Sequence, residues 1–346
     1  MCTAATFKTK KGNVFFGRNL DYEMSYGEKI VSVSRSYPFV FRHTENCLYH
    51  YAIIGMAHVE DNYPLFYDAL NEKGLAVAGL NFVSNAYYFD IDGNKDNVAS
   101  FELISYILAK FKNVYEVKKA LENINIVNTA YSDKLPPSSL HWIVVDKKGD
   151  CIVIESMKDG LHVYDNKTGC LTNNPPFNYQ LDNLKKYSFL SDEDKVKTFS
   201  FDDSFYSRGT GSTGLPGDLT STSRFIRVCY ASYFSQKEND FKLINDENEK
   251  EFGCNSLYYI LQSVEQVKGL CKVNDKYEYT IYSSSMSLLD SDEDKIGSYS
   301  FKQYNNPNVY SLDFKSILSD ESNQIKTYDL KAIDNKNNYY FKHIEE

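Results

Sequence analysis

The order of apolar and polar positions along the chain predicts strands near both ends and in the middle of the sequence. Residues 2–9 are rich in Thr, Ala and Phe, turn-forming residues 10–13 follow, and a β-like run resumes at Val14. This order is typical of a β-hairpin. The apolar runs 140–146 and 151–155, joined by a Lys-Lys-Gly-Asp turn, form the clearest second hairpin. Other strand-like runs occur at residues 29–34, 51–56, 75–81, 161–164, 277–288, 309–311 and 327–329.

Helical spacing of apolar residues marks the segments between these strands. These segments are residues 100–111, 114–123, 177–190, 222–234 and 254–267. We expect Ser100 to cap the first helix, and Thr222 or Ser223 to cap the fourth. Because helices separate the groups of strands, the pattern predicts an α+β fold. No repeat, linker or break in composition divides residues 1–346, so we expect a single domain.

Three segments between the predicted elements read as loops. Residues 57–67 contain Asp61, Asn62 and Pro64, and this loop either walls a substrate pocket or only connects strands. Residues 191–204 are predicted to form an acidic, serine-bearing loop. Residues 209–214 have the G-x-G-x-x-G spacing of dinucleotide sites, but a strand before them and a helix directly after them are missing. We interpret this run as a flexible loop without a cofactor.

The net charge limits the classes of partner. The 346 residues include 38 Lys and Arg against 47 Asp and Glu, a formal charge of −9. Nucleic-acid binding needs a clustered basic surface, which this sequence does not display. No signal-peptide pattern and no apolar run of membrane-spanning length are visible. We therefore expect a cytoplasmic protein with neither a nucleic-acid nor a membrane partner.

The cysteines give no sign of a disulfide framework or a metal site. Seven cysteines are scattered along the chain without a C-x-x-C pair, and together with the six histidines they form no zinc pattern. We expect reduced thiols, most of them small buried apolar residues. The sequence therefore predicts no metal and no cofactor.

Cys2 is the strongest candidate for chemistry. If Met1 is removed, which a small second residue permits, Cys2 becomes the N-terminus and carries both a thiol and a free α-amine. The amine titrates at about pH 8 and a thiol at about 8.5, so one group can take the other's proton. Such a residue supplies nucleophile and base without a histidine. The alternative is that Cys2 is only a small residue after the initiator.

Two charged residues of the N-terminal hairpin are candidates to assist Cys2. With the turn centred on Lys11 and Gly12, Asp21 lies opposite Cys2 and could hold the α-ammonium, while Arg18 would favour the thiolate. Arg18 and Asp21 are three positions apart, so an unbroken strand sends them to opposite faces. We expect either a bulge or a strand that stops before Asp21.

Ordered motifs from Met1 to Tyr282 resemble the choloylglycine hydrolase family of N-terminal-nucleophile amidases, which includes bile salt hydrolases and penicillin V acylases. The motifs are Met-Cys-Thr at the start, Phe-Gly-Arg-Asn-Leu-Asp at 16–21, Asn-Glu-Lys-Gly-Leu at 71–75 with Ala-Gly-Leu-Asn-Phe at 78–82, Leu-Thr-Asn-Asn-Pro at 171–175, and Gly-Leu-Pro-Gly-Asp at 214–218 with Ser-Arg-Phe at 223–225. The resemblance thus covers most of the chain.

The resemblance implies a polar catalytic site. Its members are the nucleophile Cys2, its neighbours Arg18 and Asp21, the oxyanion residues Asn81 and Asn173, and Arg224. The residues alone leave alternatives open, since an asparagine at a strand end is often a turn former and an arginine is often solvated. Without the family match, Asn173 is not separable from Asn174. For the substrate pocket we expect Leu20, Tyr26, Asn81 and Tyr63.

The resemblance also implies a fold and a substrate class. The fold is a four-layer αββα sandwich with two stacked antiparallel sheets, and the expected assembly is a homotetramer. Bile salt hydrolases usually carry asparagine where this chain has Asn81, and penicillin V acylases usually carry tyrosine. Asn81 therefore favours hydrolysis of glycine- or taurine-conjugated bile acids. Penicillin V acylase or another N-acyl amidase is the alternative, and a non-enzymatic binding protein of this fold is the third interpretation.

Overall fold

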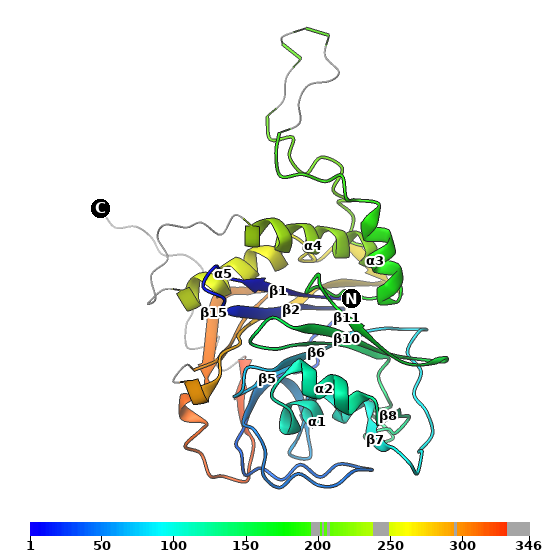
Figure 1. Cartoon of the computed structure of the whole chain (residues 1–346), viewed down its shortest axis with the longest axis vertical. Coiled ribbons are helices and arrows are strands. Elements are labelled where there is room, and N and C mark those ends of the chain that lie inside the picture. Colours follow the sequence, from blue (N-terminus) through cyan, green and yellow to red (C-terminus); the bar gives the residue numbers. More distant parts are fainter. Residues whose placement is uncertain (195–200, 203, 206–207, 238–248, 294–295, 331–346) are drawn as a thin grey trace, which may run out of the picture.

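Two antiparallel sheets lie face to face between two layers of helices (Figure 1). The computed structural model describes residues 1–194, 201–202, 204–205, 208–237, 249–293 and 296–330. The predicted α+β class and the αββα order of layers are confirmed. Within the described residues, no helix is both long and apolar enough to cross a membrane.

The first sheet carries the N-terminal hairpin. Its strands follow the order β1 (Cys2–Lys8), β2 (Val14–Tyr22), β13 (Lys276–Ser287), β14 (Ser298–Gln303) and β15 (Asn306–Asp313), and β12 (Cys271–Val273) pairs with β13. The helices above it are α3 (Phe177–Lys185), α4 (Ser221–Lys237) and α5 (Glu249–Gln262). Helices α4 and α5 pack on β1, while α3 packs on α4.

The second sheet lies beneath the first. Its order is β11 (Gly160–Asp165), β10 (Cys151–Met157), β9 (Leu140–Val145), β6 (Ala76–Asn81), β5 (Tyr63–Asn71), β4 (Ile53–Glu60), β3 (Lys29–Val33) and β16 (Lys326–Asp329). Its outer face is covered by α1 (Leu103–Lys110), with α2 (Val114–Leu121) in the same layer. Smaller elements are the parallel pair β7 (Asp96–Ala99) and β8 (Ile124–Val127), and the 3₁₀ turns η1 (Ser100–Glu102), η2 (Ser291–Glu293) and η3 (Phe314–Ser316).

Strands of the second sheet are apolar on both faces because both faces are covered. In β6, Ala76 and Ala78 belong to the core between the sheets, while Val77 belongs to the core beneath the helices. Trp142 of β9 also lies in that lower core and is fully buried. The continuous apolar runs in the sequence therefore reflect double-sided burial.

The register of the N-terminal hairpin differs from the prediction by one residue. Cys2 pairs with Leu20. Asp21 lies opposite Met1 and donates its backbone N–H to the Met1 carbonyl at 2.9 Å. The reason is a three-residue loop between Thr9 and Asn13, in which Gly12 adopts φ +94°. A positive φ at this loop position is readily adopted by glycine.

The predicted loop at residues 57–67 is a β-hairpin. Strands β4 and β5 pair from Ile53 to Asn71, and Glu60 lies opposite Tyr63. The two connecting residues, Asp61 and Asn62, have φ values of 47° and 59°. Two consecutive positive φ values are typical of the tight turns that join antiparallel strands, and Asp and Asn tolerate them.

Several predicted helix boundaries also move. Ser100 belongs to η1 rather than capping a helix, and α4 begins at Ser221, so Thr222 and Ser223 lie inside it. Helix α5 spans Glu249–Gln262, so it begins before the predicted range 254–267 and ends short of it, and Val267 is 52% exposed. No strand lies directly before residues 209–214 in the described chain and no helix directly after them, as predicted. Residues 195–200 and 203 of the predicted acidic loop lie outside the described residues.

Candidate active site

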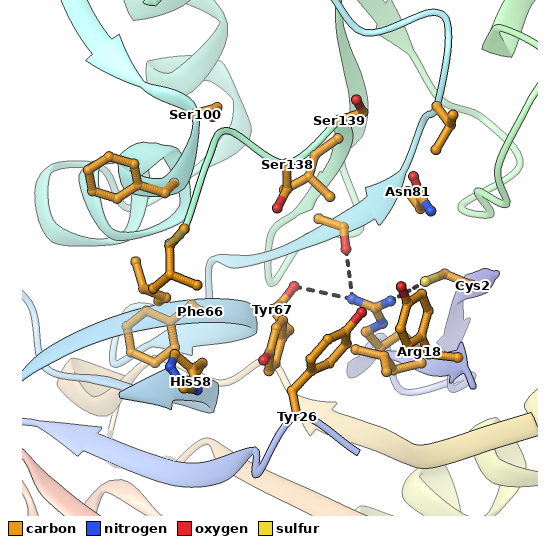
Figure 2. A pocket seen from close by; sticks show the side chains of 18 of the residues that line it. Cys2, Arg18, Tyr26, His58, Phe66, Tyr67, Asn81, Ser100, Ser138 and Ser139 are labelled. Carbon is orange, nitrogen blue, oxygen red and sulfur yellow. Dashed lines mark hydrogen bonds between the residues drawn. The ribbon is translucent and has the colours of Figure 1, made fainter. Parts of the chain in front are cut away.

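Cys2 opens β1 and directs its thiol toward the space between the sheets. Cys2 pairs with Leu20 and Ala4 pairs with Arg18, so the period of two places Cys2 and Arg18 on one face of the hairpin. Arg18 Nη2 lies 2.6 Å from Cys2 Sγ (Figure 2). Cys2 is 6% exposed. A guanidinium in direct contact with the sulfur, largely sheltered from water, stabilises a thiolate.

Arg18 is held between the two sheets. It projects from β2 of the first sheet, and its Nη1 donates to the carbonyls of Gly79 at 2.7 Å and Tyr67 at 3.3 Å in the second sheet. Burial alone lowers the pKa of Arg18, but the negative forms of Cys2, Tyr282, Asp68 and Asp21 raise the pKa above its ordinary value. Arg18 therefore remains charged beside the sulfur.

Asp21 lies on the opposite face of β2 from Arg18. The strand continues to Tyr22 without a stop, and the irregularity lies in β13, where the register shifts between Thr280 and Tyr282. The Asp21 carboxylate accepts hydrogen bonds from Thr280 Oγ1 at 2.6 Å and Gln266 Nε2 at 3.2 Å. Burial raises the pKa of Asp21, although Arg224, the chain's N-terminus, Thr280 and Arg18 act in the other direction.

Asn173 and Arg224 hold the backbone of Cys2 from the helical side. Asn173 Oδ1 accepts from Cys2 N at 2.8 Å and from Arg224 Nη2 at 2.8 Å. Arg224 Nη1 donates to the Cys2 carbonyl and to Thr3 Oγ1, each at 2.5 Å. Burial lowers the pKa of Arg224, and Asp21 is the largest opposing influence. Arg224, in the first turn of α4, thus reaches the peptide group of Cys2.

Asn81 ends β6 at the rim of the same site. Its backbone carbonyl accepts from Asn173 Nδ2 at 2.8 Å, which links the two asparagines. The Asn81 side chain lines the cavity beside Cys2 (Figure 2), and its amide has no hydrogen-bond partner among the described residues. An unused amide donor beside a buried sulfur is suited to an oxygen that gains charge during a reaction.

A largely apolar cavity of about 470 Å³ opens in front of Cys2. One wall comes from the N-terminal hairpin and the segment after it, another from β4 and β5, and a third from η1 and residues 131–140. Its apolar and aromatic lining residues are Leu20, Tyr22, Tyr26, Leu65, Phe66, Tyr67, Val83, Phe101, Tyr131, Leu135, Pro136 and Leu140. Such a cavity can hold an apolar group with its reacting bond at the sulfur.

Three of the four predicted pocket residues line this cavity, and one does not. Leu20, Tyr26 and Asn81 are lining residues. Tyr26 is 45% exposed and stacks on Tyr22 with ring centroids 4.8 Å apart. Tyr63 instead lies behind the wall, where its ring contacts Phe101 at 6.1 Å and Tyr131 at 5.8 Å between ring centroids.

The sequence reasoning missed the third wall entirely. Phe101, Tyr131 and Leu135 lie 99 or more positions after Cys2 in the chain. The packing of η1 on β5 brings Phe101 to the cavity. Within this wall, the rings of Phe101 and Tyr131 contact each other with centroids 5.4 Å apart. No periodicity in the sequence relates them to the N-terminus.

Met1 is present at the head of β1 and lines the cavity. Its α-amine donates to the Asp21 carbonyl at 2.5 Å and to the Glu278 carboxylate at 2.8 Å. In this form the nitrogen of Cys2 is a peptide N–H that donates to Asn173. A catalytic α-amine on Cys2 therefore requires the loss of Met1.

The described residues contain no group of three or more His, Cys, Asp and Glu side chains that could hold a metal ion. Polar groups converge on Cys2, with Arg18 at its sulfur and Asn173 and Arg224 at its backbone N–H and carbonyl. This arrangement provides a nucleophile, fixed positive charges and amide donors. It is suited to attack on a carbonyl carbon.

Comparison with known proteins identifies the family. The model described as linear amide C–N hydrolases, choloylglycine hydrolase family, matches residues 2–328. A bile salt hydrolase/transferase of Lactiplantibacillus plantarum is 48% identical over 316 residues, which cover 90% of this chain and 92% of the relative. A protein of the same name from Clostridium perfringens is 37% identical over 335 residues, which cover 95% and 96% of the two chains.

Solved structures agree with this assignment. The crystal structure of variant R18L of conjugated bile acid hydrolase from Clostridium perfringens matches with a TM-score of 0.82 at 36% identity, covering 95% of this chain and 97% of that one. Penicillin V acylase from Agrobacterium tumefaciens shares the fold, with a TM-score of 0.72 at 20% identity over 95% and 92% of the chains. The chain therefore belongs to the choloylglycine hydrolase family of linear amide C–N hydrolases.

Proposed function

We propose that this protein hydrolyses the amide bond of glycine- or taurine-conjugated bile acids, with Cys2 as the nucleophile. The observation that carries the proposal is the contact of 2.6 Å between Arg18 Nη2 and Cys2 Sγ at the end of a largely apolar cavity. The sulfur and the guanidinium supply the chemistry. The apolar walls suit a sterol body better than a polar acyl group.

The reaction begins once Met1 has been removed. The Cys2 thiol passes its proton to its own α-amine, and the thiolate attacks the amide carbonyl carbon to form a carbon–sulfur bond. The carbonyl oxygen takes the negative charge, and the α-ammonium then protonates the leaving nitrogen as the carbon–nitrogen bond breaks. Glycine or taurine leaves with that proton, and the bile acid remains as a thioester on Cys2.

Water completes the cycle. The α-amine takes a proton from a water molecule, whose oxygen attacks the thioester carbonyl, and the carbon–sulfur bond breaks to regenerate Cys2. In both halves the oxyanion is met by amide donors at Asn81 and Asn173. One well-placed donor of this kind contributes about 3 kcal/mol to transition-state stability. Asp21 and Arg224 hold the N-terminal backbone in place.

Two observations favour bile salts over penicillin V. Asn81 stands where penicillin V acylases usually have tyrosine, and the relatives at 48% and 37% identity are named bile salt hydrolase/transferase. That name also includes transfer, which a thioester intermediate allows when a nucleophile other than water attacks its carbonyl.

The family also motivates a proposal for the working form of the protein. We propose that residues 1–346 act as one domain, in the cytoplasm, as a homotetramer. Light scattering coupled to size-exclusion chromatography measures the assembly directly. A monomer at micromolar concentration would contradict the proposed tetramer and leave the chemistry untouched.

The decisive experiment compares substrates on one preparation whose first residue is determined by mass spectrometry. Protein beginning at Cys2 should release glycine from glycocholate and taurine from taurocholate faster than it cleaves penicillin V. Preferential cleavage of penicillin V would move the protein to the acylase branch. Full activity in protein that retains Met1 would contradict the role of the α-amine.

A further inference from the structure

Next to the catalytic segment lies a buried histidine–glutamate pair that the mechanism above does not use. His141 of β9 and Glu155 of β10 are both fully buried, and His141 Nδ1 lies 2.9 Å from Glu155 Oε1. Burying two ionisable side chains is costly unless each is fully hydrogen-bonded. Their remaining polar atoms therefore indicate what the pair holds.

Both remaining contacts go to the turn that carries Asn173. His141 Nε2 lies 2.9 Å from the carbonyl of Thr172, directly before Asn173. The Glu155 carboxylate accepts from the N–H of Phe177, the first residue of α3, at 3.1 Å and 3.2 Å. From the second sheet, the pair thus contacts both ends of residues 172–177.

The same imidazole contacts both neighbours of Asn81. His141 pairs with Leu80 across β6 and β9, and its ring stacks on Phe82 with centroids 4.3 Å apart and an interplanar angle of 7°. Leu80 and Phe82 are fully buried and flank Asn81. One side chain therefore lies against the segments that present both oxyanion residues.

Hydrogen-bond chemistry limits the roles of the two side chains. The Thr172 carbonyl is an acceptor only, so His141 Nε2 donates to it. The contact between His141 Nδ1 and Glu155 Oε1 needs one proton between its two atoms, and every polar atom of the pair then has a partner.

We propose that His141 and Glu155 are positioning residues that fix Asn81 and Asn173 relative to Cys2. This inference rests on the proposed function, because the two amides matter only if an oxyanion forms at the sulfur. A displacement of about 1 Å at such a donor lowers the rate by up to about 100-fold. Binding of the apolar part of the substrate, which none of these contacts touches, should be unaffected.

The test compares two variants that differ in hydrogen bonding rather than in size. In Glu155→Gln, the amide N–H₂ can donate to Nδ1 of a neutral His141, and the amide oxygen can accept from Phe177 N, so each partner of residue 155 keeps one hydrogen bond without a charge. In His141→Leu/Glu155→Leu, every contact is lost, yet no buried charge is left unpaired, so the protein is expected to fold. Circular dichroism and thermal melting check folding.

We expect Glu155→Gln to keep kcat within about threefold of the wild type. The double variant should lose about 10- to 100-fold in kcat with KM changed less than about threefold. A double variant with wild-type kcat would overturn the proposal, as would an equal loss in Glu155→Gln or a change confined to KM. The comparison uses glycocholate, or penicillin V if the wild type prefers it.

A readout without substrate separates this inference from the proposed function. In a crystal structure of the double variant, Asn173 Oδ1 should no longer lie 2.8 Å from Cys2 N. An unchanged distance would overturn the positioning role whatever the substrate is. A displaced Asn173 in a protein whose wild type cleaves neither substrate would support the positioning role and contradict the proposed function alone.

Discussion

The polar site around Cys2 and the apolar wall of the cavity are built in different ways. At Cys2, each of Arg18, Asn173 and Arg224 is fixed by at least two hydrogen bonds to named backbone or side-chain atoms. At the wall, side chains such as Tyr26 and Phe101 are fixed mainly by ring contacts. Hydrogen bonds fix the positions of the reacting groups, whereas ring contacts shape the cavity. Substitutions in the polar site should therefore change kcat, and substitutions in the wall should change KM.

The largest effect is expected at the sulfur itself. Cys2→Ser keeps the shape and the α-amine but replaces the thiolate by a far weaker nucleophile, so kcat should fall by roughly 10⁴-fold or more. Turnover of glycocholate measures this loss. Cys229→Ser, at a buried cysteine in the same core as Cys2, is the matched control and should retain activity if it folds. Activity in Cys2→Ser near the wild-type level would contradict the proposed role of the Cys2 thiolate as the nucleophile.

Loss of the guanidinium at Arg18 should be the next most severe change. Arg18→Leu removes the only hydrogen-bond donor to the Cys2 sulfur among the described residues and leaves the Gly79 carbonyl without its side-chain donor, so kcat should fall by about 10³-fold. Arg18→Lys keeps a positive charge without the planar fork and should fall between Arg18→Leu and the wild type. Rates of Cys2 alkylation should follow the same order. Equal alkylation in all three proteins would contradict the role of Arg18.

Adjacent asparagines test how sharply the polar site is defined. Asn173→Ala removes the partner of Cys2 N and should lower kcat by about 100-fold. Asn174 donates instead to the Val83 carbonyl at 2.7 Å and is exposed, so Asn174→Ala should change kcat by less than about threefold. Steady-state kinetics of both variants settle the assignment. Comparable losses would mean that the turn as a whole, rather than one amide, carries the effect.

At the wall, the expected change is in KM. Tyr26→Ala removes a half-exposed ring that lines the cavity and should raise KM by about 10-fold with little change in kcat. Tyr63→Phe removes a hydroxyl that lies behind the wall and should leave KM unchanged. A raised KM in Tyr63→Phe would restore Tyr63 as a substrate contact. A fall in kcat in Tyr26→Ala would contradict the prediction that wall residues affect KM alone.

The smallest effect on catalysis is expected at Glu102, beside the wall residue Phe101. Burial raises the pKa of Glu102 to about 7, although hydrogen bonds from Arg42 and Ala99 and the charge of Arg42 act against it. A raised folded pKa means that the unfolded chain releases the proton first. Glu102 therefore stabilises the fold fully below about pH 4.5, and this contribution is lost as pH rises to about 7.

The free energy of unfolding, measured in urea at pH 5 and pH 8, should fall between the two by up to about 3 kcal/mol from this residue. Glu102→Gln should abolish that part of the difference and leave KM and kcat unchanged. Glu122→Gln, at an exposed position after α2, is the control. A pH dependence that persists undiminished in Glu102→Gln would contradict the assignment.

The sequence predicted the elements better than their relation to one another. The composition of residues 2–9 and the turn residues 10–13 correctly indicated a hairpin, and a three-residue loop around Gly12 shifted its register by one. Turn type decides register, and the residues Lys-Lys-Gly-Asn permit more than one turn. The hairpin at Asp61 and Asn62 was not predicted, because polar turn residues beside Pro64 indicated a loop. In the structure, Pro64 lies within β5.

The candidate site was accessible to the sequence only in part. Cys2, Arg18 and Asp21 lie within one hairpin, so local reasoning could bring them together. Asn173 and Arg224 reach Cys2 from separate segments, and only the family motifs pointed to them. Tyr131 and Leu135 of the wall carry no motif and lie far along the chain, and their place in the cavity follows from tertiary packing alone.

Arg18 belongs to one sheet and donates two of its hydrogen bonds to the other, at the carbonyls of Tyr67 and Gly79. Reactivity of the thiol therefore reports whether the halves of the sandwich are docked. On gentle heating, a small shift of one sheet relative to the other should abolish catalytic activity at a lower temperature than that at which the secondary structure unfolds. The contact between Arg18 and the Cys2 sulfur therefore depends on how the two sheets pack.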